Sequence, residues 1–146
     1  MASDVPDRLK QLLSSQALAV LATQDRGRPH ASLVGFAATD DLRRLVFVTP
    51  RASRKFASLK ADARAAMLVD NRTHRASDFA DAMAATALGR AREVAPKQGS
   101  PLLDLFLREY PQLEGFATAP DTALVALHVE AYRVVTDFQE VTELRP

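Results

Sequence analysis

The sequence predicts an α+β protein, mainly β, in which six antiparallel strands form a small closed or split barrel with short flanking helices. Three observations predict this class. Six short segments are apolar and β-branched and are bounded by turn signals. The segments with helical character are short, so no strand precedes the long crossover helix that a parallel sheet needs. Closure into a barrel would also remove the exposed edges of such a sheet.

The composition fits one domain over residues 1–146, long enough to bury a core. Hydrophobic residues make up 47% and charged residues 25%, as in an ordinary globular protein. The net charge of +1 argues against a protein that coats nucleic acid, and no apolar run is long enough to span a membrane. The absence of cysteine excludes disulfides, cysteine-ligated metals and a cysteine nucleophile. Because the N-terminal segment has no apolar signal core, we expect a cytoplasmic protein.

The first elements are a helix and three strands. Apolar residues recur at helical spacing from Val5 to Leu13, which predicts a helix with one apolar face. The buried strand 18–23 and the strand 30–39 are separated by a turn in which Gly27 can take a positive φ. The strand 45–49 follows a tight connection. The three strands are therefore expected to form an antiparallel meander.

The central part of the chain alternates again between helix and strand. A short helix is expected over about residues 52–60, and a fourth strand over 64–71. The polar segment RTHRASDFADAM is expected to be a loop or a short helix. A fifth strand covers 85–94, and Gly89 within it indicates a bulge or the close approach of another backbone.

The last part of the chain combines a broken helix with a long strand. Residues 102–116 read as helical, with an interruption at Pro111. Residues 122–135 alternate between apolar and polar, which predicts a sixth strand that points His128 outward. The tail TDFQEVTEL is expected to extend this strand or to cover a sheet edge.

The segment TPRASRK, residues 49–55, is the strongest candidate for a binding site. It places the hydroxyls of Thr49 and Ser53 and the cations Arg54 and Lys55 where a strand ends and a helix begins. The N–H groups of a helix N-terminus and nearby cations can hold a phosphate group, and an arginine can bind two of its oxygens at once. The same composition also fits an ordinary solvated turn. The segment alone leaves both interpretations open.

The order of these segments resembles the pyridoxamine 5'-phosphate oxidase-like family of FMN-binding split barrels. The stretch VFVTPRASRKF matches the family pattern of an aromatic or aliphatic residue, then Thr-x-x-x-Ser-Arg-Lys. The turn GRPHAS and the strand ALGRAREV agree with the family in order and spacing. The match runs from about Leu13 to Val94, and a looser one from Tyr110 to Leu144. The resemblance implies a homodimer that binds FMN between its subunits.

The resemblance also implies which residues contact the cofactor. Arg54 and Lys55 would hold the FMN phosphate, and Thr49 and Ser53 would be hydroxyl donors near the phosphate or the ribityl chain. The flavin ring would lie along the second strand and beside the ends of the third and fourth strands. The further contacts that this implies are His30, Ser32, Leu33, Val34, Val48, Asn71 and Arg72.

Several positions depart from the authentic pyridoxamine phosphate oxidases. Ser32 and Ala37 stand where those enzymes carry Arg and Lys, Ala84 stands in place of a Gln, and the chain has no Trp. The resemblance therefore implies a short branch of the family, an oxidoreductase that acts on an unknown small molecule. No residue identifies that substrate or a catalytic group. The deazaflavin F420 fits the same prediction in place of FMN.

The histidines leave a second function open. His30, His74 and His128 are far apart in sequence and lack the spacing of paired metal ligands, so no metal site is predicted. Some family relatives bind haem, and the segment YPQL is loosely similar to theirs. A haem-handling or non-catalytic protein that uses His74 or His128 is therefore the alternative. His30, at the start of the second strand, could also hydrogen-bond to the flavin or the substrate.

Overall fold

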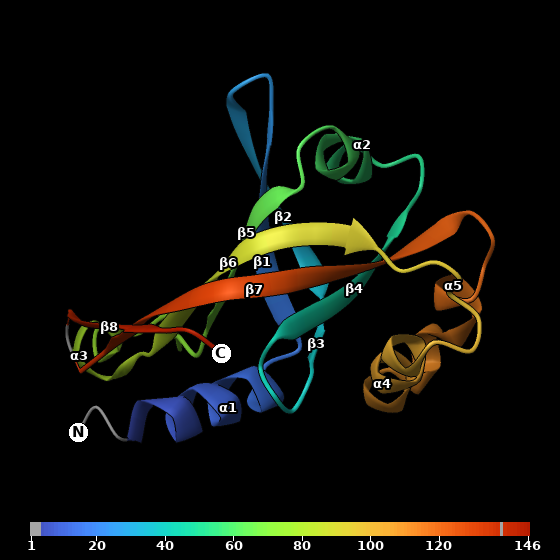
Figure 1. The fold of residues 1–146 in the computed structure, drawn as a ribbon. Coiled ribbons are helices and arrows are strands. Elements are labelled where there is room, and N and C mark those ends of the chain that lie inside the picture. The colour runs from blue at the N-terminus through green and yellow to red at the C-terminus, as the bar shows by residue number, and fades with distance from the viewer. Residues whose placement is uncertain (1–3, 138) are drawn as a thin grey trace.

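Strands dominate the computed structural model, which describes residues 4–137 and 139–146 (Figure 1). The strands are β1 (Leu18–Asp25), β2 (Arg28–Gly35), β3 (Ala37–Ala38), β4 (Arg44–Pro50), β5 (Arg64–Asp70), β6 (Ala84–Glu93), β7 (Thr122–Thr136) and β8 (Glu140–Leu144). The helices are α1 (Val5–Ser15), α2 (Arg54–Ala61), α3 (Asp78–Asp81), α4 (Pro101–Glu109), the 3-10 helix η2 (Pro111–Leu113) and α5 (Glu114–Ala117). Among the described residues, no helix is both long and apolar enough to cross a membrane.

The strands form one antiparallel sheet that curls back on itself. Its order is β2-β1-β5-β6-β7-β4-β3, and β8 pairs with β7 beside this path. The two ends of the path, β2 and β3, are separated in sequence by Phe36 alone. The sheet therefore begins and ends on one stretch of chain, which gives the split barrel of Figure 1. The predicted class, α+β and mainly β with an antiparallel split barrel, is confirmed.

The predicted second strand, 30–39, is in fact two strands. The backbone turns at Phe36, whose side chain is buried in the core and whose N–H donates to Ala17 O at 3.1 Å. On one side of this turn β2 pairs with β1, and on the other side β3 pairs with β4. The three predicted strands therefore pair consecutively and antiparallel, as the expected meander requires, but the middle strand is broken at Phe36. The division of this strand and the pairing of the tail as β8 raise the strand number from six to eight.

The hairpin of β1 and β2 is closed by a two-residue turn. Its last pair is Asp25 with Arg28, and the turn residues Arg26 and Gly27 have φ values of 53° and 82°. Positive φ at both positions is the geometry that matches the twist of a tight hairpin. The predicted positive φ at Gly27 is confirmed, and the hairpin projects beyond the barrel next to α2 (Figure 1).

Helices cover the barrel at three places. The main core fills its interior, and α1 contributes Val5, Leu9, Leu12 and Leu13 to it. From the end of the barrel beside the hairpin, α2 contributes Phe56 and Leu59. A second core lies on the outer face of the sheet, where α4 and α5 pack on Val46 and Leu124. The first half of β7 is therefore buried on both faces, and the predicted alternation of burial begins only at His128, which is exposed as expected.

Gly89 lets β6 and β7 approach each other closely. The register of the two strands shifts between Leu88 and Gly89. A Cβ atom at Gly89 would lie 2.0 Å from the backbone oxygen of His128. The predicted bulge and close approach at this glycine are both confirmed.

Candidate functional site

A cleft separates the tip of the β1–β2 hairpin from the start of α2. Its volume is about 450 Å³. The residues that line it are Asp25, Arg26, Arg28, Pro29, His30, Arg54 and Ser58. Two of the predicted contacts, His30 and Arg54, therefore come together here from segments that lie far apart in the sequence.

Two hydroxyls of the TPRASRK segment cap and support the start of α2. Ser53 is the N-cap residue, and its Oγ accepts a hydrogen bond from Phe56 N at 3.2 Å. The Oγ1 atom of Thr49 lies 2.8 Å from Ser53 Oγ, and Thr49 is fully buried. When Thr49 donates in this pair, the hydroxyl proton of Ser53 stays available to an anion. The first-turn N–H groups that are not capped, those of Arg54 and Lys55, are donors for the same anion.

The three cations of the segment differ in their partners. Arg51 pairs with Glu93 at 2.6 Å and donates to Pro120 O at 3.0 Å, so it ties β4 to its neighbours. Arg54 is exposed and Lys55 is half-buried. Within the described part of the chain, neither of these two side chains has a recorded ion pair or hydrogen bond. Two of the three cations are therefore available to a ligand.

Two buried hydroxyls lie on the inner face of the hairpin. Strand register places Thr23 opposite His30 and Ser32 opposite Leu21, which puts all four side chains on that face. Among the described residues, the Thr23 and Ser32 hydroxyl oxygens are buried without a hydrogen-bond partner. An unpaired buried hydroxyl costs about 1–3 kcal/mol. A polar ligand would remove that cost.

Thr23 was not predicted as a site residue. The signal in the sequence is weak: within the predicted strand, Leu21 and Thr23 point to the same side, so a hydroxyl replaces an apolar residue on the core-facing side. A threonine at a strand position is common enough that the substitution alone predicts nothing. Only the register with β2, which places Thr23 beside His30, links it to the cleft.

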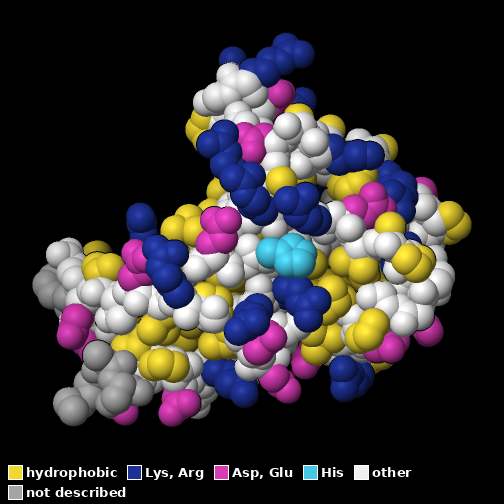
Figure 2. Space-filling model, in the orientation of Figure 1, with side chains coloured by type: hydrophobic (Ala, Val, Ile, Leu, Met, Phe, Trp, Pro, Cys, Tyr) yellow, Lys and Arg dark blue, Asp and Glu magenta, His cyan; other side chains and the backbone are white. Residues whose placement is uncertain are grey.

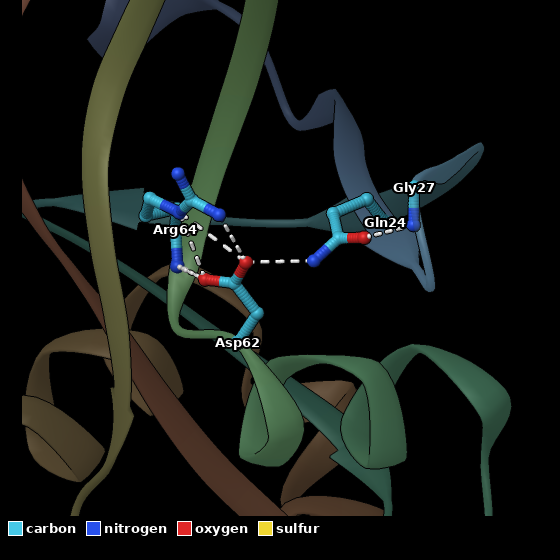
Figure 3. A network of polar contacts seen from close by, with 4 residues as sticks. All are labelled: Gln24, Gly27, Asp62 and Arg64. Carbon is cyan, nitrogen blue, oxygen red and sulfur yellow. Dashed lines mark hydrogen bonds and ion pairs between the residues drawn. The ribbon is translucent and has the colours of Figure 1, made fainter.

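A polar network fixes the hairpin against the end of α2 (Figure 3). Asp62, the C-cap residue of α2, accepts from Gln24 Nε2 at 2.6 Å and from the Arg64 guanidinium at 2.6 Å. Gln24 Oε1 in turn accepts from Gly27 N at 2.7 Å in the hairpin turn. The hydrogen bonds from Arg64 are the main reason that the pKa of Asp62 lies well below its ordinary value. The network joins the hairpin to α2 beside the cleft, and none of its members was predicted as a site residue.

Asn71 and Arg72 lie away from the cleft. They follow the last residue of β5, whereas α2 and the cleft lie at its first residue, and seven strand residues span roughly 20 Å. Asn71 Oδ1 accepts from Met83 N at 2.8 Å, and Arg72 pairs with Asp70 at 2.7 Å. Within one chain, the structure therefore does not join these two residues to Arg54, because strand direction carries them to the opposite end of the barrel.

Three predicted apolar contacts point in different directions. The Val34 side chain is buried in the main core, and Val48 packs against the second core beneath α4. Leu33 is 65% exposed on the outer face of the sheet. None of these side chains lines the cleft. Contacts from Val34 and Val48 to a cofactor would have to come from their backbones, because the side chains serve the two cores.

The histidines occupy three separate environments. His30 lines the cleft, and His74 is exposed in the loop after β5, where its backbone N–H donates to Asp78 Oδ2 at 2.8 Å. His128 lies on the outer face of β7, where burial first and then Arg44 lower its pKa. The end of β5 lies level with residue 135 of β7, roughly 23 Å along the strand from His128. His74 and His128 therefore cannot both ligate one iron.

The described residues include no group of three His, Asp or Glu side chains that could hold a metal ion.

Comparison with known proteins points to one family. The family model for pyridoxamine 5'-phosphate oxidase matches residues 5–136. No curated protein matches the chain.

Solved structures share the fold at low sequence identity. A heme binding protein from Mycobacterium smegmatis superimposes with a TM-score of 0.84 at 17% identity, over 99% of this chain and 58% of that one. General Stress Protein 26 from Bacillus anthracis str. Sterne has a TM-score of 0.74 at 16% identity, over 98% and 99%. An FAD-binding protein from Mesorhizobium loti has a TM-score of 0.71 at 16% identity, over 88% and 90%. This chain thus spans less than two thirds of the mycobacterial protein.

Proposed function

The chain belongs to the pyridoxamine 5'-phosphate oxidase-like split-barrel family, and from this membership we propose that it is an FMN-binding flavoprotein. One observation carries the proposal. Arg54 and Lys55 lie without recorded protein partners at the capped start of α2, beside a cleft of about 450 Å³. That volume falls in the range of cofactor sites. The arrangement suits a phosphate group attached to a larger body.

The residues of the cleft fit the polar part of FMN. Arg54 can bind two phosphate oxygens at once, and Lys55 adds a positive charge. The helix N–H groups and the Ser53 hydroxyl are further donors. The hydroxyls of Ser32 and Thr23 lie on the His30 face of the hairpin, but both are buried and neither residue lines the cleft, so they are not counted among the donors to FMN. Bound FMN would supply the redox chemistry, while this chain would bind and orient it.

The outer face of the sheet supports a homodimer. Leu18 and Leu33 are 58% and 65% exposed there. Cross-strand pairing continues this apolar face over β1, β2, β5 and β6 through Val20, Ala22, Ala31, Ala66, Leu68 and Leu88. A contiguous exposed apolar face marks an interaction site, and its many alanines allow two sheets to approach closely. We expect a second copy to cover this face and to complete the flavin site from the partner side.

The substrate is expected to be a small molecule that exchanges a hydride with the flavin, without being pyridoxamine phosphate. Ser32 and Ala37 supply no cation where authentic oxidases carry Arg and Lys. The hydroxyl of Ser32 lies on the inner face of β2, and the side chain of Ala37 is buried. The chain therefore lacks those two cations, and a substrate phosphate would have to find other partners.

Visible absorption of the freshly purified protein tests this function. We expect a two-band flavin spectrum, or its appearance after FMN is added and the excess removed, with FMN identified after denaturation. Arg54→Ala combined with Lys55→Ala should give folded protein with FMN affinity lowered at least about 100-fold, since two charge-assisted contacts are lost. Lys60→Ala, at the other end of α2, is the matched control and should keep FMN.

Each outcome has a definite meaning. Full flavin occupancy in the Arg54→Ala, Lys55→Ala variant would show that the phosphate lies elsewhere. If the protein binds F420 but not FMN, the cleft remains the proposed cofactor site, and the cofactor assigned to it changes from FMN to F420. Dimerisation is tested separately by the mass in solution of wild type and of Leu33→Asp, which places a charge on the apolar face; a monomeric wild type would exclude the homodimer.

Haem handling is the second candidate, and one observation favours it. The imidazole of His128 is exposed, and burial, followed by Arg44 and Arg92, lowers its pKa, which favours the neutral form that a metal ligand takes. A Soret band after addition of haem that disappears in His128→Ala and persists in His74→Ala would establish this function. If wild-type protein takes up no haem, the candidate is excluded.

A further inference from the structure

A row of cations crosses the outer face of the sheet around His128. Arg44 of β4 lies directly opposite His128 of β7, and Arg90 of β6 lies opposite His128 on its other side. Arg92 follows in the next row, opposite Ala126. Directly opposite residues share a face and have Cβ atoms about 5 Å apart. In the space-filling view, Lys and Arg side chains gather around a histidine in the middle of this face (Figure 2).

This row carries little compensating negative charge. Glu130 is 63% exposed and approaches Arg90 only to 3.8 Å. Arg44 and Arg92 have no recorded ion pair among the described residues. Asp41 interacts with Arg44, but its carboxylate is hydrogen-bonded to Thr39. Arg44 and Arg90 flank His128 on the two neighbouring strands, about 10 Å apart at two strand spacings, so an anion over His128 would interact with both.

We propose that Arg44, His128 and Arg90 bind the phosphate group of a small phosphorylated molecule, at a site separate from the cleft beside Arg54. Two arginine forks on either side of an imidazole present donors that match the oxygens of one tetrahedral dianion. The row lies on the outer face of the sheet, whereas Thr23 and His30 mark the cleft on the inner face of the hairpin. The two sites can therefore be occupied at the same time.

A groove beside the row has room for the organic part of this molecule. Its volume is about 420 Å³, and Arg44 forms part of its wall. Leu102 and Leu105 of α4 give it an apolar side. Arg108 adds a second cation, and the carboxylates of Asp40 and Glu109 also line the groove. A phosphate held at His128 by Arg44 would place an attached apolar group in this groove. The site therefore favours a phosphate ester with an apolar body over inorganic phosphate.

Binding should depend on pH through His128. The groups that face this imidazole are Arg44 from β4, Arg90 and Arg92 from β6, and Glu130 from β7. Burial, followed by Arg44 and Arg92, lowers the His128 pKa, which favours the neutral ring when no ligand is bound. A bound dianion favours the imidazolium form. Binding should therefore tighten as pH falls through the His128 pKa, and sulfate, which stays a dianion throughout this range, isolates the effect.

The histidine ring signals in proton NMR spectra test the proposal, because the chain has only three histidines. We expect inorganic phosphate, and more strongly phenyl phosphate, to shift the His128 signal in the FMN-loaded protein. His30 reports on the cleft beside Arg54, and His74 is the internal control. The combined change Arg44→Gln and Arg90→Gln should weaken phenyl phosphate binding at least about tenfold, while Arg75→Gln, which removes an exposed loop cation, should not.

Three results would overturn the proposal. The first is a His128 signal that stays constant at millimolar phenyl phosphate while that of His30 moves. The second is unchanged affinity in the Arg44→Gln, Arg90→Gln variant. The third is a His128 shift that a short oligonucleotide produces at much lower concentration than phenyl phosphate, which would identify a nucleic-acid surface instead. Equal affinity for phosphate and phenyl phosphate would exclude the groove beside α4 as part of the site.

Discussion

Two groups of cations on this barrel have different structural supports. Arg54 and Lys55 follow one another in sequence, and a helix cap aligns them with the N–H groups of the same turn. Arg44 and Arg90 lie 46 positions apart in the numbering. They come to lie on either side of His128 only because β4 and β6 both pair with β7. The first group depends on local structure, and the second depends on the register of three strands. The two groups should therefore respond to different mutations.

The opposite end of the barrel shows a cation whose partners come from the chain itself. Arg72 pairs with Asp70, and Asn71 bonds to Met83 through both its side chain and its backbone. Their hydrogen-bonding groups serve the fold. The cations that we assign to ligands have no recorded partners of this kind, or only one distant partner. The pattern of partners, more than the charge itself, therefore separates binding residues from structural ones.

Gly89→Ala should have the largest effect and should act on the register-dependent group. The new Cβ would lie 2.0 Å from His128 O and 2.9 Å from His128 C, and both are backbone atoms that cannot move aside. We expect the free energy of unfolding to fall by about 3 kcal/mol or more, measured by urea denaturation. Any folded fraction should lose the phosphate-induced shift of His128.

Gly115→Ala is the matched control for this change. Gly115 lies in α5, and nothing approaches its added Cβ within 4 Å. The substitution should leave stability unchanged or raise it by up to about 1 kcal/mol, because alanine loses less backbone freedom in a helix. If Gly89→Ala were as well tolerated as Gly115→Ala, the close approach of β6 and β7 would not be a constraint in solution.

Two substitutions of Ser53 distinguish its role as a helix cap from its proposed role in the anion site of the first group. Ser53→Ala removes the cap and should cost about 1 kcal/mol of stability. Ser53→Asp keeps a capping oxygen but places a carboxylate beside Arg54, so stability should be retained while FMN affinity falls roughly tenfold or more. Denaturant unfolding and FMN fluorescence quenching measure the two effects. Wild-type FMN affinity in Ser53→Asp would show that the phosphate does not lie at this helix start.

The sequence predicts local structure well and register poorly. The helix start at Ser53, the turn at Gly27 and the bulge at Gly89 each depend on a few neighbouring residues, and all three are present in the structure. The break at Phe36 was missed, because it depends on β2 and β3 finding different partners. The position of Asn71 was not predicted for a related reason: strand order and direction, which no short motif encodes, place it within one chain at the end of β5 away from Arg54.

The candidate site, like the fold, was predicted only where it depends on neighbouring residues in the sequence. The TPRASRK motif identifies Arg54 and Lys55 without any tertiary information, since both come from one turn of helix. The row around His128 was not predicted, because its arginines belong to separate strands. Within each strand they fit the ordinary alternation of polar and apolar residues. The network of Gln24, Asp62 and Arg64 was missed likewise, because its hairpin and helix are distant in sequence.

Substitution of Asp62 is expected to have the smallest effect. It tests whether the network of Gln24, Asp62 and Arg64 supports the cleft. Hydrogen bonds from Arg64, above all, hold the Asp62 pKa below its ordinary value of 3.8. Its contribution to stability is therefore complete above that value and is lost as pH falls below it. Asp62→Asn should be less stable than wild type near pH 7 and should lose less stability in acid, as measured by urea unfolding across the pH range. It should also weaken FMN binding slightly, because the hairpin is no longer held against α2.

Asp78 provides the comparison that makes this test specific. Its pKa is also lowered, chiefly by hydrogen bonds from Thr73, but it is the first residue of α3, beyond the other end of β5. Asp78→Asn should therefore change the acid dependence of stability in the same direction as Asp62→Asn and leave FMN affinity unchanged. If both variants bind FMN like wild type, the hairpin reaches its position without the Asp62 network. If both weaken it equally, the two ends of the barrel are coupled, as they would be where the far end of one subunit completes the cleft of its partner.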